Sequence, residues 1–184
     1  MNDQMRRAVF LDRDGVINRA IIRDGKPHPP RTLAELQIPE DVPAALGSLQ
    51  AAGFILIGVT NQPDVARGIQ KRAVVEAINH ALMQRLPLRE IRVCYHDDAD
   101  HCDCRKPRAG LLLQAAAQYH IDLSASFMIG DRWKDIEAGY RAGCQTVLID
   151  RQYAEAWSGA LPDWRAPSLA AAVNWILATQ AVNL

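Results

Sequence analysis

Residues 8–15 read Ala-Val-Phe-Leu-Asp-Arg-Asp-Gly, a short apolar run that ends directly at two carboxylates. An apolar run of this length, bounded by polar residues, is typical of a buried β-strand. Similar apolar runs occur at 54–59, 91–94, 127–129 and 146–149. The carboxyl ends of parallel strands lie along one edge of a sheet, where open α/β sheets bind their ligands. The residues that follow each run are therefore the candidate functional residues.

Helical patterns separate these runs. They cover residues 42–52, 71–86, 109–119, 134–142 and 168–180. Gly53 and Gly143 follow two of the patterns, and glycine commonly ends a helix because it takes the left-handed conformation at little cost. The alternation predicts an α/β fold, a three-layer α/β/α Rossmann-like arrangement with a mainly parallel sheet and no large cap domain. We expect a single domain over residues 1–184, with the proline-rich stretch 19–39 as an irregular excursion.

Composition argues against several classes of protein. The 184 residues are 49% hydrophobic and 23% charged, as in ordinary globular proteins, and 21 basic residues balance 21 acidic ones. A chain without net charge has no overall attraction to nucleic acid or to an anionic membrane. Residues 1–4 begin no secretory signal, and polar residues interrupt the uncharged stretch 166–184, which is typical of a surface helix. We expect a cytoplasmic monomer with neither nucleic acid nor membrane as partner.

Polar residues that suit phosphoryl chemistry follow four of the runs. Asp12 and Asp14 follow the first, Thr60 the second, Lys106 the third and Asp131 the fourth. Three carboxylates in one place repel one another unless a cation lies among them, and hard oxygen ligands suit Mg²⁺. Together with Mg²⁺, Lys106 and Thr60 would neutralise and orient a phosphate. A carboxylate beside the metal can attack phosphorus and carry the group as an aspartyl-phosphate.

Each of these residues also has an ordinary structural interpretation. Asp14 and the glycine after it are a common turn pair, and Thr60 can be a turn or cap residue. Lys106 can be a solvated charge, and Asp131 can cap the helix that follows it. The occurrence of all of them at successive strand ends of one chain favours a catalytic site.

A polar segment, residues 94–108, is rich in metal-ligand residue types, and we refer to it as the Cys/His loop. It contains two alternating pairs, Cys94 with His96 and Cys102 with Cys104. Alternation directs both members of a pair to one side of an extended chain, so the two pairs can close a tetrahedral zinc site, for which His101 is a competing ligand. Cysteines also fill cores, which is the better interpretation of Cys144, but a polar loop has no core to fill. Four protein ligands make a zinc site structural.

Four stretches of the sequence together resemble the motifs of the haloacid dehalogenase superfamily. They are 10–18 (Phe-Leu-Asp-Arg-Asp-Gly-Val-Ile-Asn), 59–62 (Val-Thr-Asn-Gln), 104–107 (Cys-Arg-Lys-Pro) and 129–135 (Ile-Gly-Asp-Arg-Trp-Lys-Asp). The resemblance extends from about residue 9 to residue 150 and is closest to the small-cap branch that contains the heptose bisphosphate and histidinol-phosphate phosphatases. Asp14 lies two residues after Asp12. In this feature the sequence resembles the phosphatases of the superfamily, because its dehalogenases lack the second acid.

The resemblance implies a role for each catalytic residue. Asp12 would be the nucleophile, and Asp14 would protonate the leaving oxygen and then deprotonate the attacking water. Thr60 and Lys106 would stabilise the transferring phosphoryl group. The carboxylates of Asp12 and Asp131 and the backbone carbonyl of Asp14 would hold the catalytic Mg²⁺.

The resemblance also implies supporting and substrate-binding residues. Asp135 would lie behind the metal ligands and orient a water or the lysine of the site. The substrate would contact Asn61, Gln62, Arg105 and Arg132, the two arginines through a phosphate that is not cleaved. The family pattern favours His96 over His101, so the structural Zn²⁺ would be bound by Cys94, His96, Cys102 and Cys104.

The substrate implied by the resemblance is a small sugar bisphosphate, as in the heptose bisphosphate phosphatases. The intervals between the motifs are too short for a large cap, so specificity must come from the excursion 19–39, the Cys/His loop and the two arginines. Histidinol phosphate is the main alternative, because its phosphatases share the motifs and the zinc pattern. A catalytically silent zinc-stabilised binding module and a phosphatase of nucleic-acid ends are further alternatives. The intact acid pair argues against the first, and the zero net charge against the second.

Overall fold

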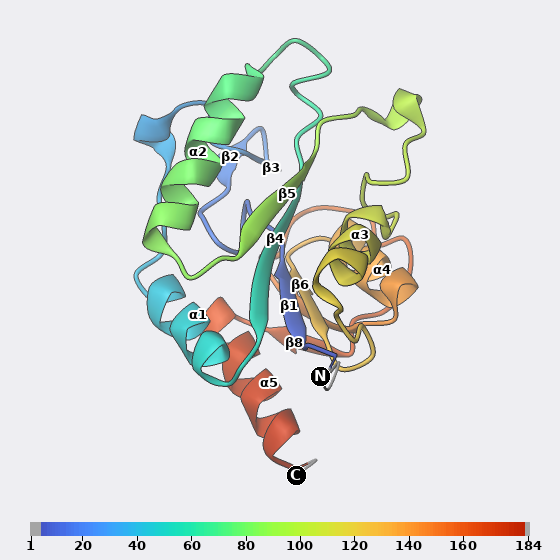
Figure 1. Ribbon diagram of the computed structural model, residues 1–184. Helices are drawn as coiled ribbons and strands as arrows, with labels where there is room; N and C mark the ends of the chain where they lie inside the picture. The colour runs from blue at the N-terminus through green and yellow to red at the C-terminus, as the bar shows by residue number, and fades with distance from the viewer. Residues whose placement is uncertain (1–4, 183–184) are drawn as a thin grey trace.

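A parallel sheet forms the centre of the structure, a computed structural model that describes residues 5–182 (Figure 1). Its six strands are β1 (Ala8–Leu11), β4 (Ile55–Asn61), β5 (Glu90–Cys94), β6 (Phe127–Gly130), β7 (Gln145–Ile149) and β8 (Trp164–Ala166). They lie in the order β5-β4-β1-β6-β7-β8, and every neighbouring pair is parallel. The carboxyl ends of β4, β1 and β6 are therefore adjacent at one edge of the sheet.

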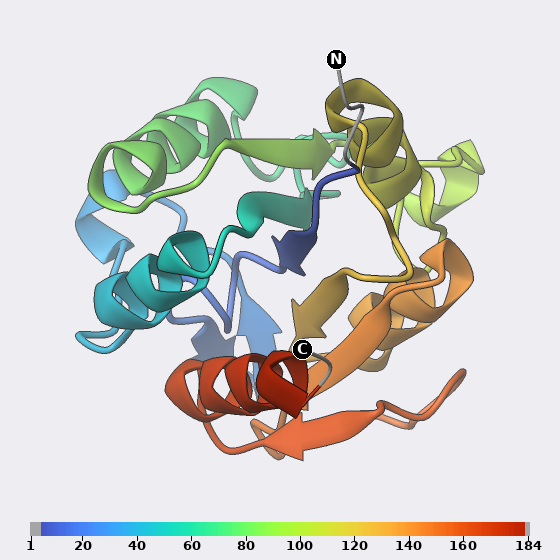
Figure 2. The ribbon, with the colours of Figure 1, turned by 60° about the horizontal axis from the view of Figure 1, so that its bottom comes forward.

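Helices cover both faces of this sheet (Figure 2). One face carries α1 (Val42–Ala51), α2 (Arg72–Arg85) and α5 (Leu169–Val182), and the other carries α3 (Gly110–Tyr119) and α4 (Trp133–Ala142). Successive side chains of β1 alternate between the two cores, with Val9 and Leu11 in one and Ala8 and Phe10 in the other. The predicted three-layer α/β/α arrangement is confirmed, and each predicted strand or helix agrees with the structure to within two residues at its ends.

The proline-rich excursion differs from the expectation of irregular chain. It contains an antiparallel hairpin, β2 (Ile21–Arg23) and β3 (Lys26–His28), and a short 3₁₀ helix, η1 (Leu33–Glu35). Asp24 and Gly25 form its turn with φ angles of 50° and 71°. Because Asp-Gly readily takes this left-handed geometry, it is a strong signal for a two-residue hairpin turn, and the prolines nearby masked it. Strand β8 was also missed, because its three residues carry no periodic pattern.

Aromatic residues lock the strand β8 and the helix α5 onto the sheet. The ring of Phe127 on β6 meets the rings of Phe54 and Trp175 edge-on, with centroids 5.9 Å and 6.2 Å away. Trp164 of β8 stacks on Trp175 at 5.4 Å. Edge-to-face and stacked geometries are the favourable ones for such pairs. This cluster lies near the amino-terminal ends of β4, β6 and β8, away from the carboxyl ends of these strands.

Two sequence-based expectations concern the ends of the chain. Residues 1–4, which carry the argument about a secretory signal, lie outside the described residues, as do the last two residues of the stretch 166–184. Within residues 5–182, none of the helices is long and apolar enough to cross a membrane.

Candidate active site

The ends of three adjacent strands bring the predicted catalytic residues together. Asp12 directly follows β1, Thr60 is the penultimate residue of β4, and Asp131 directly follows β6. The Asp12 amide donates to the Ile129 carbonyl at 2.9 Å, which continues the pairing of β1 with β6 into the site. Lys106 arrives from the Cys/His loop after β5, and these four residues are all more than nine-tenths buried. Asp12, Thr60 and Lys106 line a cavity of about 90 Å³.

Lys106 is held at the centre of the site by three acceptors. Its Nζ atom lies 2.7 Å from Asp12 Oδ1, 2.6 Å from Asp135 Oδ1 and 2.7 Å from the carbonyl oxygen of Val59. Burial by itself lowers the pKa of Lys106, but the carboxylates of Asp12 and Asp135 outweigh it and raise that pKa above its usual value. The ammonium therefore stays charged, and Asp135 contacts the lysine, which is one of the two partners that the family resemblance implied for it.

Three carboxylates, those of Asp12, Asp131 and Asp135, lie around the single ammonium of Lys106. Burial raises the pKa of Asp12 to about 7, although Lys106 acts in the opposite direction and Asp135 adds to the rise. Burial and the charge of Asp12 also raise the pKa of Asp131 well above its usual value. Carboxylate oxygens of Asp12, Asp131 and Asp135 lie within 4.8 Å of one another. Burial and mutual repulsion thus disfavour the ionised form of these carboxylates, and a bound cation would favour that form again.

Asp131 has one hydrogen-bonded oxygen and one free oxygen. Its Oδ2 atom accepts a hydrogen bond from the hydroxyl of Tyr153 at 2.9 Å. Its Oδ1 atom is buried and has no hydrogen-bond partner among the described residues. A buried carboxylate oxygen without a donor is costly unless an ion or water binds it. This oxygen, beside Asp12 and Asp135, gives the acidic cluster the chemistry of a hard-cation site.

Asp14 is oriented by donors on three sides. Its carboxylate accepts hydrogen bonds from Arg13 Nη2 at 2.9 Å, from Asn18 Nδ2 at 3.0 Å and from Gln62 Nε2 at 2.8 Å. Gln62 Nε2 also donates to Thr60 Oγ1 at 2.9 Å. Sequence analysis assigned no role to Arg13, whose fully buried guanidinium has no recognisable sequence signal beyond its place between the two aspartates. Gln62 was predicted to bind substrate, and that role stays a prediction for a side chain that is 2% exposed.

Asn61 connects two loops of the site. Its Nδ2 atom donates to the carbonyl of Lys106 at 2.9 Å, and its Oδ1 atom accepts from the Lys106 amide at 3.1 Å. The side chain therefore fixes the backbone of the loop that carries the lysine. Its predicted contact with substrate stays a prediction, because the amide already makes both of these bonds.

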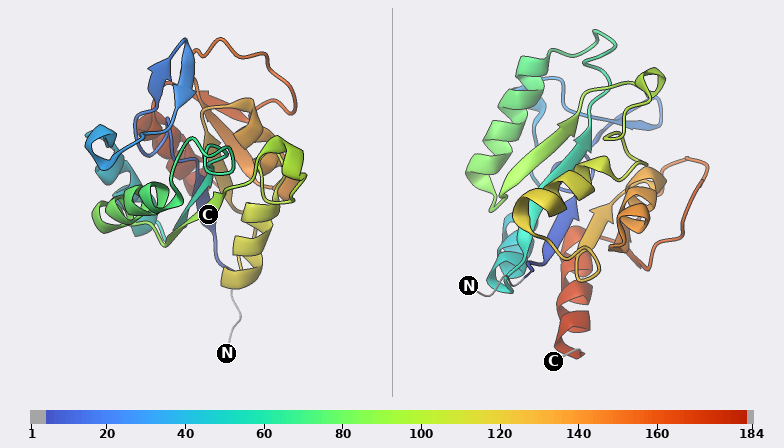
Figure 3. Two further views of the ribbon diagram at one scale, coloured as in Figure 1. Left: turned by 90° about the horizontal axis from the view of Figure 1, so that it is seen from above. Right: turned by 45° about the vertical axis from the view of Figure 1, so that its right-hand side comes forward.

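A larger cavity of about 480 Å³ adjoins the small one and shares several of its walls. The hairpin β2–β3 (blue) and the Cys/His loop (yellow-green) both rise from this end of the sheet (Figure 3). Both predicted substrate arginines line the cavity, and each is paired with an acid. Arg105 Nε donates to Asp98 Oδ1 at 2.7 Å, and Arg132 Nε donates to Glu155 Oε2 at 3.0 Å. Sequence analysis missed Glu155 and Tyr153, because no pattern in the segment between β7 and β8 indicates a contact with the site.

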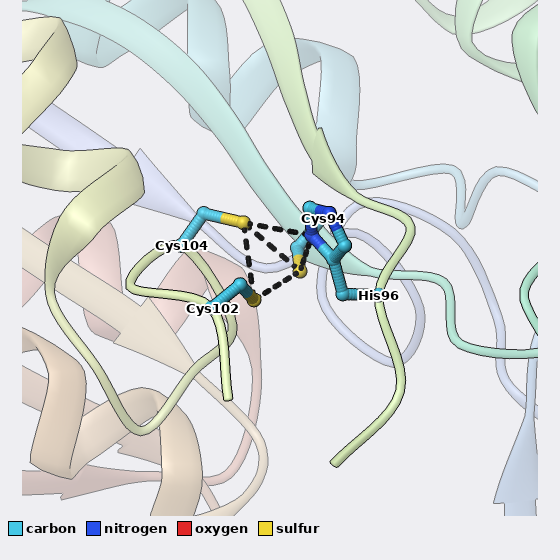
Figure 4. Close-up of side chains that lie close together, drawn as sticks. All are labelled: Cys94, His96, Cys102 and Cys104. Atoms are coloured by element: carbon cyan, nitrogen blue, oxygen red, sulfur yellow. Dashed lines mark hydrogen bonds between the residues drawn. The ribbon is translucent and has the colours of Figure 1, made fainter. Parts of the chain in front are cut away.

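The Cys/His loop gathers the four predicted zinc ligands (Figure 4). The Sγ atom of Cys104 lies 3.2 Å from that of Cys94 and 3.4 Å from that of Cys102, and His96 Nδ1 is 3.4 Å from Cys104 Sγ. Sulfur atoms bound at about 2.3 Å in a tetrahedron would be roughly 3.8 Å apart, so a small outward adjustment admits Zn²⁺. The competing residue, His101, is not part of this cluster.

The cysteine that was assigned to the core is found there. Cys144 is 7% exposed and packs in the core beneath α3 and α4. Burial raises the pKa of its thiol to about 12, so it remains a neutral, apolar group.

The fold is that of a HAD-like hydrolase. The family model described as HAD-hydrolase-like matches residues 103–172, which include Lys106 and Asp131. A crystal structure of D,D-heptose 1,7-bisphosphate phosphatase from B. bronchiseptica, complexed with magnesium and phosphate, superposes with a TM-score of 0.78. It is 29% identical and the match covers 94% of this chain and 99% of that one.

Curated relatives show which family within the HAD-like hydrolases this chain resembles. The D-glycero-beta-D-manno-heptose-1,7-bisphosphate 7-phosphatase of Pseudomonas aeruginosa is 38% identical over 151 residues, which cover 78% of this chain and 81% of the relative. The enzyme of the same name from Escherichia coli K12 is 35% identical over 156 residues, 78% of each chain. The chain therefore belongs to the family of the heptose bisphosphate phosphatases within the HAD superfamily, and it is a phosphatase.

The contact between Gly15 and Asp131 yields a test of the site. Gly15 has a φ of +100°, and a Cβ atom there would lie 1.8 Å from Asp131 Oδ2. We expect Gly15→Ala to displace Asp131, to lower the melting temperature and to reduce phosphatase activity by about tenfold or more. Phosphate release and thermal unfolding measure both effects. The matched control is Gly47→Ala in α1, where a Cβ meets no atom within 4 Å and activity should be unchanged; full activity of Gly15→Ala would contradict the geometry.

Proposed function

We propose that this chain is a Mg²⁺-dependent phosphatase that removes the 7-phosphate of D-glycero-D-manno-heptose 1,7-bisphosphate through an aspartyl-phosphate on Asp12. The observation that carries the proposal is the position of Asp12, buried between Lys106 Nζ at 2.7 Å and the acidic cluster that includes Asp131. The names of the relatives support the sugar. We infer one catalytic domain that works as a cytoplasmic monomer on a small metabolite, with no role for nucleic acid or membrane.

Magnesium fits the residues at the site. Asp12 and Asp131 would hold it together with the backbone carbonyl of Asp14, and the buried Asp131 Oδ1, which has no hydrogen-bond partner among the described residues, is available as a ligand atom. Bound Mg²⁺ would neutralise phosphate oxygens and offset the charge of the carboxylates. The magnesium and phosphate in the B. bronchiseptica relative support this assignment.

The residues of this chain divide the reaction between them. A carboxylate oxygen of Asp12 attacks phosphorus as the bond to the sugar oxygen breaks, and Asp14 gives its proton to that oxygen. Asp14 then takes a proton from a water molecule, which attacks phosphorus and releases Asp12 as a free carboxylate. The positive charge of Lys106 stabilises the phosphoryl oxygens, as does the hydroxyl of Thr60. Arg13, Asn18 and Gln62 keep Asp14 pointing in one direction during both proton transfers.

The second phosphate of the substrate would lie in the larger cavity. Arg105 and Arg132 line that cavity together with Lys26 and Lys134, so cations surround it on several sides. Arginine can hold a phosphate with two parallel hydrogen bonds. Binding of this distal phosphate would help to position the reacting one against Asp12.

Zinc would have a structural role in the Cys/His loop. With Cys94, His96, Cys102 and Cys104 all bound, the ion has no open position for chemistry. Arg105 and Lys106 directly follow Cys104, so the ion would fix the loop at the point where it enters the active site. The acidic residues of the loop remain free to pair with arginines, as Asp98 does with Arg105.

Substitution of the two catalytic aspartates tests the covalent route. Asp12→Asn should abolish turnover without loss of the fold, because it removes the nucleophile and keeps its shape. Asp14→Asn should lose about 10²-fold or more, the usual scale of general acid–base catalysis. Steady-state phosphate release and circular dichroism are the measurements. If Asp12→Asn kept more than a small fraction of Mg²⁺-dependent turnover, the aspartyl-phosphate route would be wrong.

Zinc content tests the Cys/His loop. We expect about one zinc ion per purified chain, and much less in a Cys102→Ala variant, because a structural site needs its four ligands. Removal of zinc should loosen the loop and weaken activity, and added Mg²⁺ should not restore it. The control is Cys144→Ala, which should keep its zinc. Elemental analysis that finds no zinc, or equal zinc in Cys102→Ala, would overturn the assignment.

Substrate preference tests the sugar bisphosphate. The wild type should prefer heptose 1,7-bisphosphate to the corresponding monophosphate in kcat/KM, and the double variant Arg105→Ala/Arg132→Ala should lose most of that preference. Arg141→Ala, an exposed arginine paired with Glu137 on α4, is the matched control and should keep it. The sugar assignment fails if histidinol phosphate is a better substrate than every sugar bisphosphate, or if the double variant retains the full preference.

A further inference from the structure

A segment between β7 and β8, residues 151–155, reaches into the active site with three side chains. Arg151 Nη2 donates to the carbonyl of Gly15 at 2.8 Å, and the Tyr153 hydroxyl donates to Asp131 Oδ2 at 2.9 Å. Glu155 forms an ion pair with Arg132 at the cavity wall. The backbone of the segment is fixed locally, since the Glu155 amide donates to the Tyr153 carbonyl at 2.8 Å. None of these residues belongs to a motif that the sequence analysis identified.

Tyr153 fixes the orientation of the Asp131 carboxylate. A carboxylate can rotate broadly about its terminal torsion, so the direction in which its two equivalent oxygens point is not set unless a partner holds one of them. A neutral phenol facing a carboxylate can act only as the donor, and here it occupies Oδ2. The buried Oδ1 is then the oxygen without a partner, on a carboxylate that belongs to the acidic cluster with Asp12.

Space for the Asp131 carboxylate beside this hydroxyl exists only because residue 15 is glycine. A Cβ atom at that position would lie 1.8 Å from Asp131 Oδ2 and 3.2 Å from the Tyr153 hydroxyl oxygen. The phenol, the carboxylate and the glycine therefore meet in one close contact. Asp131 itself is 5% exposed, so the tyrosine replaces the water that would otherwise hydrate this side of the carboxylate.

We propose that Tyr153 is a positioning residue that holds Asp131 with Oδ1 directed to the catalytic cation. The inference rests on the proposed function, in which Asp131 is a magnesium ligand. Hydrogen bonds from outside the ligand shell orient ligating carboxylates, and their loss typically costs 10- to 100-fold in metal affinity or activity. The other contacts of the segment, through Arg151 and Glu155, hold the chain in place when the hydroxyl alone is removed.

The test is a magnesium titration of the Tyr153→Phe variant by calorimetry, in the absence of substrate. We expect the Kd for Mg²⁺ to rise about tenfold, with little change in melting temperature. In turnover assays, the Mg²⁺ concentration for half-maximal activity should rise by a similar factor, while kcat at saturating Mg²⁺ largely recovers. Tyr140→Phe, a 66% exposed tyrosine on α4, is the control and should bind Mg²⁺ as the wild type does.

Two further variants distinguish a failure of the positioning role of Tyr153 from a failure of the proposed function. Unchanged Mg²⁺ affinity in Tyr153→Phe overturns the positioning role alone. An equal loss of affinity in Glu155→Gln, which loosens the segment without touching Asp131, also overturns it, because the effect then comes from the placement of the segment. Equal Mg²⁺ affinity of wild type and Asp131→Asn instead overturns the proposed function itself.

Discussion

The buried ammonium of Lys106 and its three acceptors are the interaction on which the rest of the site depends. An ammonium has three hydrogens, and here Asp12, Asp135 and the carbonyl of Val59 accept all of them. Burial of such charges is costly unless they are fully paired, so the geometry tolerates little displacement. Because the acceptors belong to the end of β1, the start of α4 and the strand β4, this one side chain fixes three elements relative to one another.

The loop that carries this lysine is fixed from two directions. Asn61 holds the Lys106 backbone through the nitrogen and the oxygen of its side-chain amide, and Cys104, two residues before Lys106, belongs to the Cys/His cluster. Asp135 closes the arrangement from the other side, because its second oxygen accepts from the Arg132 amide and so begins α4. Residues that look like separate motifs in the sequence thus form one connected set of contacts.

Sequence reasoning succeeded where a local pattern has a single structural outcome. The apolar run before Asp12, the alternating helices and the spacing of the Cys/His pairs all gave elements or clusters that the structure contains. It failed where the outcome depends on distant partners. Strand β8 pairs with β7 and is held there by the stacking of Trp164 on Trp175, and Tyr153 meets Asp131 only because the fold brings residue 153 beside the end of β6. The hairpin at Asp24 was a different error, since its turn signal was present and the surrounding prolines were given more weight.

The two arginines of the larger cavity are already paired with acids, which lowers the free energy that a phosphate would gain by binding to them. Arg105 and Arg132 are already paired with Asp98 and Glu155, so a phosphate that bound to them would exchange one anion for another instead of meeting unpaired charges. Such an exchange gains much less electrostatic free energy than a first pairing does. A phosphate held in this way would be released easily, because the carboxylates that compete with it for the arginines stay in the cavity wall.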